Sequence, residues 1–172
     1  MEQDIFKIVV TGPESSGKTT LARDLAAVLG CACVPEFARP YVAHLGRPYV
    51  YNDLKTIALG QQIWEDWFCR QYAPTPLLVN DTDWTVIRIW EFYKYGSVGI
   101  TTPPPLVADL YLLCSPDFDW HPDPLREHPH ERPALFDLYL SLLRSAEARY
   151  QIMSGNPETR LETARQVIRK YC

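Results

Sequence analysis

The residues with the clearest chemical signature lie near the start of the chain, where segment 12–19 reads GPESSGKT. This segment fits G-x-x-x-x-G-K-[ST], a pattern in which glycines let the backbone curl so that its amides point at phosphate oxygens. Lys18 can reach the β- and γ-phosphates of a nucleotide, and the Thr19 hydroxyl can ligate Mg²⁺. The alternative is a glycine-rich turn that only caps a helix. The pattern predicts a nucleotide-phosphate site built from Gly12, Glu14, Ser15, Ser16, Gly17, Lys18, Thr19 and Thr20.

Carboxylates follow two other short apolar runs, where strand ends would bring them toward this phosphate site. In LLVNDTD, Asp81 would face the phosphate loop and hold Mg²⁺ directly or through water. Asp83 could contact the substrate or the metal, or it could N-cap the following helix, and the two roles are compatible. In PEFAR, Glu36 would accept a proton from a substrate hydroxyl or hydrogen-bond to it, and Arg39 is a second candidate substrate contact. The alternative for Glu36 and Arg39 is an i,i+3 ion pair on a helix surface.

A Pro-rich segment with two arginines, residues 115–132, is a candidate lid. Phosphoryl transfer needs positive charge on the phosphate oxygens, and a closing loop can bring an arginine there and expel water. Arg126 is preferred over Arg132 for this role, and the alternative is a solvated charged loop. The same segment carries four residues of metal-ligand type whose spacing fits no zinc site: His121, Asp123, His128 and His130.

Several aromatic residues are expected near the same strand ends. Trp64 and Trp84 are candidate walls for a flat substrate ring, and Phe37 and Trp90 belong to the same group. The competing interpretation is that these side chains are ordinary core, because aromatic residues at helical spacing usually pack against other elements.

The elements that must position these residues alternate along the chain. Short apolar runs predict strands at 5–10, 31–34, 77–79, 110–113 and 150–153. Helical periodicity and stop signals predict helices at 19–29, 36–45, 53–72 with Asp53 as N-cap, 83–93, 133–149 and 157–170. Strands that alternate with helices indicate an α/β protein with a parallel five-stranded sheet covered on both faces. Ligands of such sheets bind at the carboxyl ends of the strands.

Composition narrows the class of protein. A chain of 172 residues fits one domain, and a net charge of −4 without a basic run argues against nucleic acid as a partner. No run approaches the roughly 18 apolar residues that a membrane span needs. The five cysteines are odd in number and lack zinc-finger spacing, so we expect reduced thiols in a cytoplasmic protein.

The ordered set of motifs resembles one known family. In this chain GPESSGKTTLA, PEFARPY, YNDLKTIALGQQIW, LLVNDTDW and WHPDPLR follow one another, and the ribosylnicotinamide kinase domain of NadR-type proteins has the same order. The resemblance covers nearly the whole chain. It implies a P-loop NTPase with the nucleoside-monophosphate-kinase-like fold, which uses ATP and Mg²⁺ to phosphorylate nicotinamide riboside to nicotinamide mononucleotide. In that family, the acids matching Asp81 and Asp83 serve metal and substrate. The position matching Glu36 lies by the ribose, and the position matching Arg126 meets the phosphates.

Two features depart from the pattern of that family. Its members carry an aromatic residue before the glutamate, where Pro35 stands here, whereas their second ring-stacking aromatic is matched by Trp64. They also carry an adenylyltransferase domain before the kinase, whereas the first predicted strand of this chain begins at Ile5. We therefore expect a single kinase domain over 1–172, with a homo-oligomer or a partner enzyme of NAD synthesis as its associations.

Two other functions stay open from the sequence. The domain could be an NTP-driven regulatory ATPase or switch without a small-molecule acceptor. It could also be a kinase for shikimate, a sugar or another metabolite on the same fold, although an aromatic-rich pocket argues mildly against polar acceptors. A GTPase would carry N-K-x-D for guanine, which this sequence lacks, and a ring ATPase usually adds a helical domain after the core.

Overall fold

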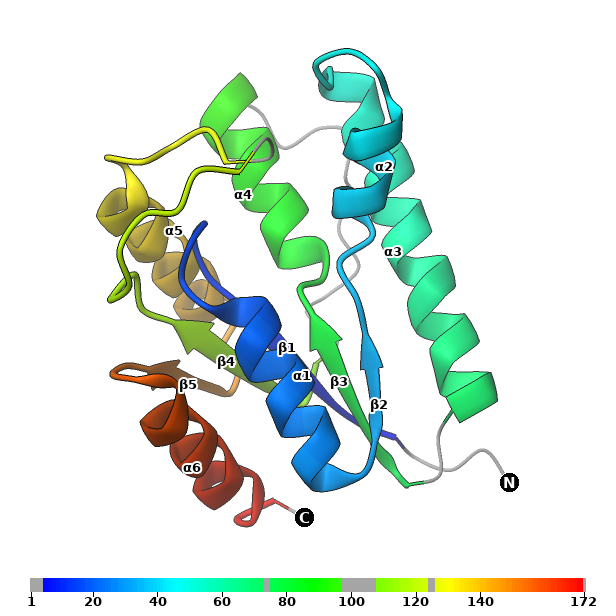
Figure 1. Ribbon diagram of the computed structural model, residues 1–172, viewed down its shortest axis with the longest axis vertical. Helices are drawn as coiled ribbons and strands as arrows, with labels where there is room; N and C mark the ends of the chain where they lie inside the picture. The colour runs from blue at the N-terminus through cyan, green and yellow to red at the C-terminus, as the bar shows by residue number, and fades with distance from the viewer. Residues whose placement is uncertain (1–4, 73–74, 97–107, 124–125, 172) are drawn as a thin grey trace.

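Five parallel strands form the centre of the molecule, in the order β2-β3-β1-β4-β5 (Figure 1). The computed structural model describes all residues except 1–4, 73–74, 97–107, 124–125 and 172. The strands are β1 (Phe6–Thr11), β2 (Ala32–Val34), β3 (Leu77–Asp81), β4 (Leu110–Cys114) and β5 (Tyr150–Met153). Their short apolar sequences are buried because helices cover both faces of a parallel sheet.

Alternate residues of the strands point to opposite faces of the sheet and pack into two separate hydrophobic cores. Ile8 and Val10 of β1 pack with α1 (Lys18–Leu29) and α6 (Pro157–Ile168) on one face. Val9, between them, points to the opposite face, which α4 (Trp84–Tyr95) and α5 (Arg132–Ser145) cover. The remaining helices, α2 (Ala38–His44) and α3 (Tyr51–Tyr72), lie beside β2 and β3 (Figure 1).

The strand order brings the candidate site residues to one edge of the sheet. β1 pairs with β3 on one side and β4 on the other, and β2 pairs with β3, always in parallel register. The phosphate loop follows β1, Glu36 follows β2, and Asp81 ends β3. Because the chain leaves β1 for one side of the sheet and later returns to the other, these ends meet at the switch point where α/β sheets bind ligands.

The predicted five-stranded parallel sheet and its covering helices are confirmed, with shifts at some boundaries. α2 begins at Ala38 instead of Glu36, which leaves Glu36 in the extended segment after β2. α5 ends at Ser145, not at Arg149, because Glu147 adopts a positive φ of 50° that a helix cannot continue. Residues 124–125 of the predicted lid lie outside the described residues.

Asp53 is not the N-cap of α3, which corrects the prediction. It lies in the first turn, and its carboxylate reaches back to accept the backbone N–H of Val50 at 2.7 Å, as the third residue of a capping box does. Arg47 also donates to Asp53, at 2.8 Å, and this hydrogen bond is the main reason that the pKa of Asp53 is lowered. Within the described ranges, no helix has both the length and the apolar character to cross a bilayer.

Candidate active site

The loop between β1 and α1 adopts backbone conformations that its glycines make accessible. Gly12 has a φ of 135° and Gly17 a φ of 80°. A Cβ atom on Gly12 would lie 2.7 Å from the carbonyl oxygen of Cys114 at the end of β4, a distance that forces the backbone to move. The loop can therefore curl against β4 only with glycine at position 12.

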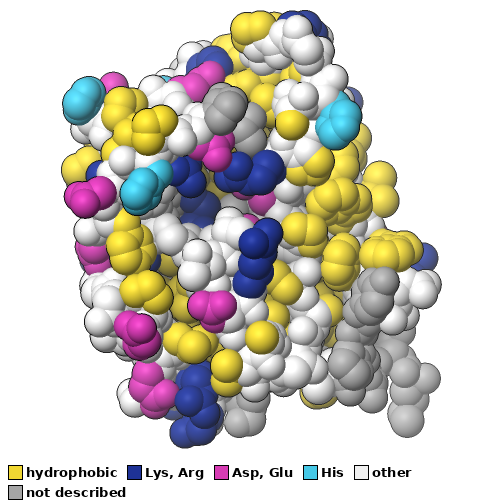
Figure 2. Space-filling view, in the orientation of Figure 1, with side chains coloured by type: hydrophobic (Ala, Val, Ile, Leu, Met, Phe, Trp, Pro, Cys, Tyr) yellow, Lys and Arg dark blue, Asp and Glu magenta, His cyan; other side chains and the backbone are white. Residues whose placement is uncertain are grey.

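A first cavity, of about 130 Å³, opens directly over this loop. Residues 12–20 form its floor, and Figure 2 shows Lys and Arg side chains gathered around a hollow in the surface. Side chains from four other segments complete the lining: Glu36, Arg39, Val86, Ile89, Trp90, Arg126, Leu135 and Tyr139. The predicted phosphate-loop residues thus share one space with the predicted acceptor-side pair and the preferred lid arginine.

Two side chains of the phosphate loop, those of Ser16 and Lys18, are turned toward its own backbone. The Lys18 Nζ donates to the Pro13 carbonyl at 2.7 Å, and the Ser16 hydroxyl donates to the same oxygen at 2.7 Å. The ammonium group is thereby held over the cavity floor, where the positive end of α1 also favours an anion.

Thr19 and Asp81 meet beside this loop, as the sequence predicts for a Mg²⁺ site. The Thr19 hydroxyl donates to Asp81 Oδ2 at 2.6 Å, while Asp81 Oδ1 is buried without a hydrogen-bond partner. Burial raises the pKa of Asp81, and the bond from Thr19 and the charge of Lys18 oppose that rise. A buried carboxylate oxygen without a partner is costly unless a cation binds it, so the residues present fit Mg²⁺. The described residues offer no cluster of three or more His, Cys, Asp or Glu for a metal.

Glu36 and Arg39 line the first cavity from the acceptor side. Arg39 Nε lies 3.8 Å from Glu36 Oε2, and Arg39 Nη1 lies 2.9 Å from Asp123 Oδ2 in the lid segment. Burial raises the pKa of Glu36, with the Lys18 ammonium as the largest opposing influence. The predicted ion pair exists, but it is long and faces the cavity, which leaves the carboxylate available to a substrate hydroxyl.

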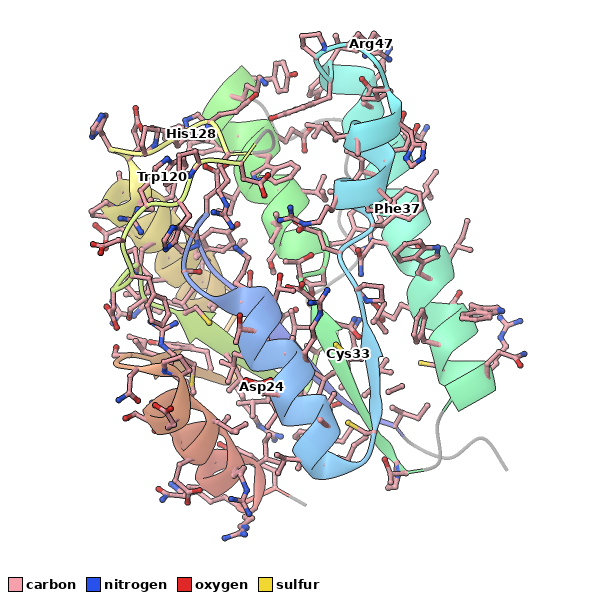
Figure 3. The ribbon with its side chains drawn as sticks, in the orientation of Figure 1. Asp24, Cys33, Phe37, Arg47, Trp120 and His128 are labelled. Carbon is pink, nitrogen blue, oxygen red and sulfur yellow. The ribbon has the colours of Figure 1, made fainter. Side chains whose placement is uncertain are left out.

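Arg126 borders both the first cavity and a second one of about 270 Å³. The second cavity lies over the first half of α1 and is lined by Asp24, which Figure 3 labels near the middle of this helix. Phe118, His121, Pro157 and Arg160 complete this wall. Arg132 does not line either of these two cavities, and its Nη1 donates to the Phe118 carbonyl at 2.7 Å. The geometry therefore favours Arg126 over Arg132 as the lid arginine.

A carboxylate in the phosphate loop binds the lid. Glu14 Oε2 accepts the backbone N–H groups of Glu127 at 3.0 Å and His128 at 3.1 Å. His128 follows Arg126 closely on the lid segment, whose position Figure 3 shows. Because the Glu14 side chain is bonded to the lid, its predicted contact with nucleotide would have to be made by its backbone.

A family model described as an AAA domain matches residues 7–160, from β1 to the first turn of α6. The chain belongs to this AAA domain family. It is 30% identical over 147 residues to the trifunctional NAD biosynthesis/regulator protein NadR of Salmonella typhimurium. That match covers 80% of the chain and 35% of the relative, so the chain spans about a third of the length of this curated relative. The similarity to NadR-type proteins predicted from the motifs is confirmed.

Solved structures share the fold of the AAA domain. A NadR protein in complex with NR gives a TM-score of 0.79 at 20% identity, over 98% of this chain and 52% of that chain. A NadR protein in complex with NAD and AMP-PNP gives 0.75 at 19% identity, over 98% and 50%. Thymidylate kinase from Ehrlichia chaffeensis gives 0.67 at 11% identity, over 95% and 98%. The predicted P-loop kinase fold is confirmed.

The carboxylate of Asp83 accepts hydrogen bonds from within the AAA domain. Thr82 has a φ of 71°, and after this turn Asp83 becomes the N-cap of α4. Its Oδ1 accepts the Thr85 N–H at 2.9 Å and the Thr85 hydroxyl at 2.6 Å, and Oδ2 accepts the Tyr111 hydroxyl at 3.1 Å. The predicted capping role of Asp83 is therefore confirmed. Its carboxylate is buried and does not line the first cavity, and its contact with substrate or metal stays a prediction.

The aromatic wall of the cavity also differs from the predicted one. Trp64 packs edge-on against Phe37 at 5.0 Å between ring centroids, and Phe37 itself faces α3 (Figure 3). Trp84 joins the same group of partly buried residues around Leu54. Both tryptophans are partly buried and pack against core residues, and neither lines the first cavity, whereas Trp90 and Tyr139 do. Tyr139 was missed because only the packing of α5 against α4 brings it to the site.

Arg160 is a second residue that the sequence did not signal. It lies in the first turn of α6, where an arginine ordinarily faces solvent, yet it is 1% exposed. Its guanidinium contacts the phosphate loop through the carbonyl of Ser16. No motif spacing could have predicted this contact, since 144 residues separate the two along the chain.

Proposed function

We propose that this AAA domain transfers the γ-phosphoryl group of ATP to a hydroxyl of a small nucleoside. The observation that carries the proposal is the single cavity in which Glu36 and Arg39 face the phosphate loop and Arg126. A site that only hydrolysed ATP would need no lined space beside the γ-phosphate. The NadR and thymidylate kinase structures that share the fold support a phosphotransferase.

The residues divide the reaction between them. The loop amides and Lys18 bind the phosphates, and Thr19 and Asp81 would hold Mg²⁺, which when bound neutralises charge on the phosphate oxygens. The acceptor oxygen attacks the γ-phosphorus, the bond from that phosphorus to the β–γ bridging oxygen breaks, and ADP leaves. The Glu36 carboxylate accepts the proton of the acceptor hydroxyl. Arg126 stabilises charge on the transferred group, and the lid excludes water.

Nicotinamide riboside is the acceptor that we propose. Trp90, Tyr139 and three aliphatic side chains give the cavity a flat apolar wall, which suits a base better than a sugar or shikimate. A cationic nicotinamide ring would gain from the electron-rich face of Trp90 and from the Glu36 carboxylate. The similarity to NadR, one structure of which is in complex with NR, supports the same acceptor.

The proposal places the reaction in the cytoplasm, with one catalytic domain over 1–172. The four cysteines in the described residues, Cys31, Cys33, Cys69 and Cys114, are free thiols, in keeping with a reducing compartment. The product, nicotinamide mononucleotide, would then pass to an adenylyltransferase as a partner enzyme of NAD synthesis, and self-association is a further proposal.

Single-substrate kinetics test the acceptor. We expect saturable phosphorylation of nicotinamide riboside with MgATP, and weaker activity on uridine, cytidine, thymidine and shikimate. Trp90→Ala should raise KM for the acceptor roughly tenfold, because base–aromatic stacking contributes on the order of 1–3 kcal/mol. Trp64→Ala is the matched control and should leave KM within about twofold at a temperature where it is folded. ATP hydrolysis without any phosphorylated acceptor would favour the regulatory ATPase instead.

A further inference from the structure

Arg160 contacts three segments at the carboxyl edge of the sheet. Its Nη1 donates to the Ser16 carbonyl of the phosphate loop at 2.6 Å, and its Nη2 donates to the Ser115 carbonyl after β4 at 2.9 Å. Its Nε donates to the Gly155 carbonyl after β5 at 2.9 Å. The Asp117 carboxylate, 3.1 Å from Nη2, is the acidic partner. The guanidinium thus fastens the phosphate loop to the loops that flank it.

Burial of this charge needs a compensating arrangement. The Arg160 side chain is 1% exposed, whereas that of Asp117 is 38% exposed, so the ion pair is only half shielded from water. Removing a cation from water is costly unless its donors are all used in good geometry. The planar fork of arginine serves three carbonyls in different directions, which a lysine ammonium on a flexible stem cannot do equally well.

The bond to Ser16 fixes the direction of the next amide. The peptide bonds of the described residues are all trans, and a trans peptide directs its C=O and its N–H to opposite sides. Because the Ser16 carbonyl is held by Arg160, the Gly17 N–H is directed away from Arg160. Both Ser16 and Gly17 line the first cavity. The Gly17 N–H, which a phosphate oxygen in this cavity would meet, is therefore oriented by Arg160 of α6.

Phe118 holds the same peptide from a second side. A Cβ atom on Gly17 would lie 2.7 Å from Phe118 Cε2, so the ring is packed directly on this glycine. The Arg160 guanidinium lies 4.5 Å from the centroid of the same ring, within cation–π distance. Arg160, Phe118 and Gly17 thus form one stacked unit beneath the phosphate loop.

We propose that Arg160 is a positioning residue for phosphate binding, which orients the Ser16–Gly17 peptide toward the phosphates. The inference rests on the nucleotide site of the proposed function and not on the identity of the acceptor. The inference does not depend on how the nucleotide base is bound, because only the phosphates would contact the Gly17 amide.

Calorimetry with two ligands separates the phosphate loop from the second cavity, which Arg160 also lines. Wild type, Arg160→Lys and Arg160→Gln are titrated with MgATP and with inorganic tripolyphosphate, below the melting temperature of each variant. We expect both ligands to bind roughly tenfold or more weakly in both variants, because bonds from a charged donor are lost. Arg165→Lys, on the exposed face of the same helix, is the matched control and should stay within about twofold.

Two results would overturn the proposal. Weaker MgATP binding with unchanged tripolyphosphate binding would assign Arg160 to the second cavity alone. A lower melting temperature with unchanged affinity for both ligands would make it a merely structural residue. Should neither variant fold, Phe118→Leu keeps the guanidinium and loosens Gly17. We then expect about threefold weaker tripolyphosphate binding, and no change would also overturn the proposal. All of these affinities are measured without acceptor, so failure to phosphorylate nucleosides would refute the proposed function and leave this inference standing.

Discussion

The two halves of the candidate site are held by different kinds of interaction. On the phosphate side, glycine conformations and backbone carbonyls fix the loop, and Gly12 packs against Cys114. On the acceptor side, side chains from the lid and from distant helices meet through ion pairs near the surface, such as Arg39 with Asp123. Backbone constraints tolerate little change, whereas surface ion pairs each contribute little. We therefore expect the phosphate side to be rigid and general, and the acceptor side to be adaptable.

Removal of the Lys18 charge should have the largest effect. Lys18→Ala is expected to lower kcat on the order of 10²–10³-fold or more, because nothing else in the loop places a cation on the γ-phosphate. The melting temperature should change little, since among the described residues the ammonium donates only to the Pro13 carbonyl. Steady-state kinetics and a thermal melt measure both. A Lys18→Ala variant that retained turnover would contradict the role of Lys18 on the phosphate side.

Glu36→Gln tests the acceptor half at its reacting end. We expect about a 10²-fold loss in kcat, typical of a general base. Because burial raises the pKa of Glu36, the acid limb of the kcat/KM profile should lie above pH 4.5, the ordinary pKa of a glutamate.

The raised pKa of Glu36 also lowers the free energy of unfolding as pH rises, since the folded state binds the proton more tightly than the unfolded state. Glu36→Gln should therefore melt higher than wild type at pH 7, and this gain should vanish below about pH 4.5. An unchanged kcat, or an acid limb at or below pH 4.5, would exclude the role.

Asp81→Asn should act through Mg²⁺. The asparagine keeps the bond from Thr19 but loses the charge of the unpartnered oxygen. We expect the Mg²⁺ concentration for half-maximal activity to rise about 10- to 100-fold, the range typical of lost support at a metal site. Titration of activity with Mg²⁺ at fixed ATP checks this. A variant with the wild-type Mg²⁺ dependence would remove Asp81 from the site.

The smallest effect should come from the Arg39–Asp123 ion pair. The Arg39 side chain is 47% exposed, so Asp123→Asn should change KM for the acceptor less than about threefold. The loss should also diminish at high salt, because salt screens exposed charges. A tenfold or larger rise in KM would show that this contact between the lid and α2 controls the acceptor side, which would then not be the adaptable half of the site.

The same contrast explains what the sequence could predict. The phosphate loop and the acids at the ends of β2 and β3 are local signals, and the alternation of strands with helices predicts a parallel sheet whose strand ends share one edge. The fold class and the positions of Lys18, Thr19, Asp81 and Glu36 could therefore be predicted, whereas the strand order could not. The aromatic wall was not, because helical spacing alone does not say which face of α3 or α4 meets the cavity. Trp64 and Trp90 have the same residue type, and only packing separates them. Arg160 gave no signal at all, since its partners are carbonyls.

The two hydrogen bonds that the Glu14 carboxylate accepts from lid amides connect the lid to the phosphate loop, so their loss would change how ATP is divided between acceptor and water. In the proposed reaction, a lid held on the loop by these bonds would keep bulk water from the nucleotide. A lid released from them would let water compete with the acceptor for the same phosphorus. The ratio of ATP hydrolysed to product phosphorylated would then report how often the lid leaves the loop.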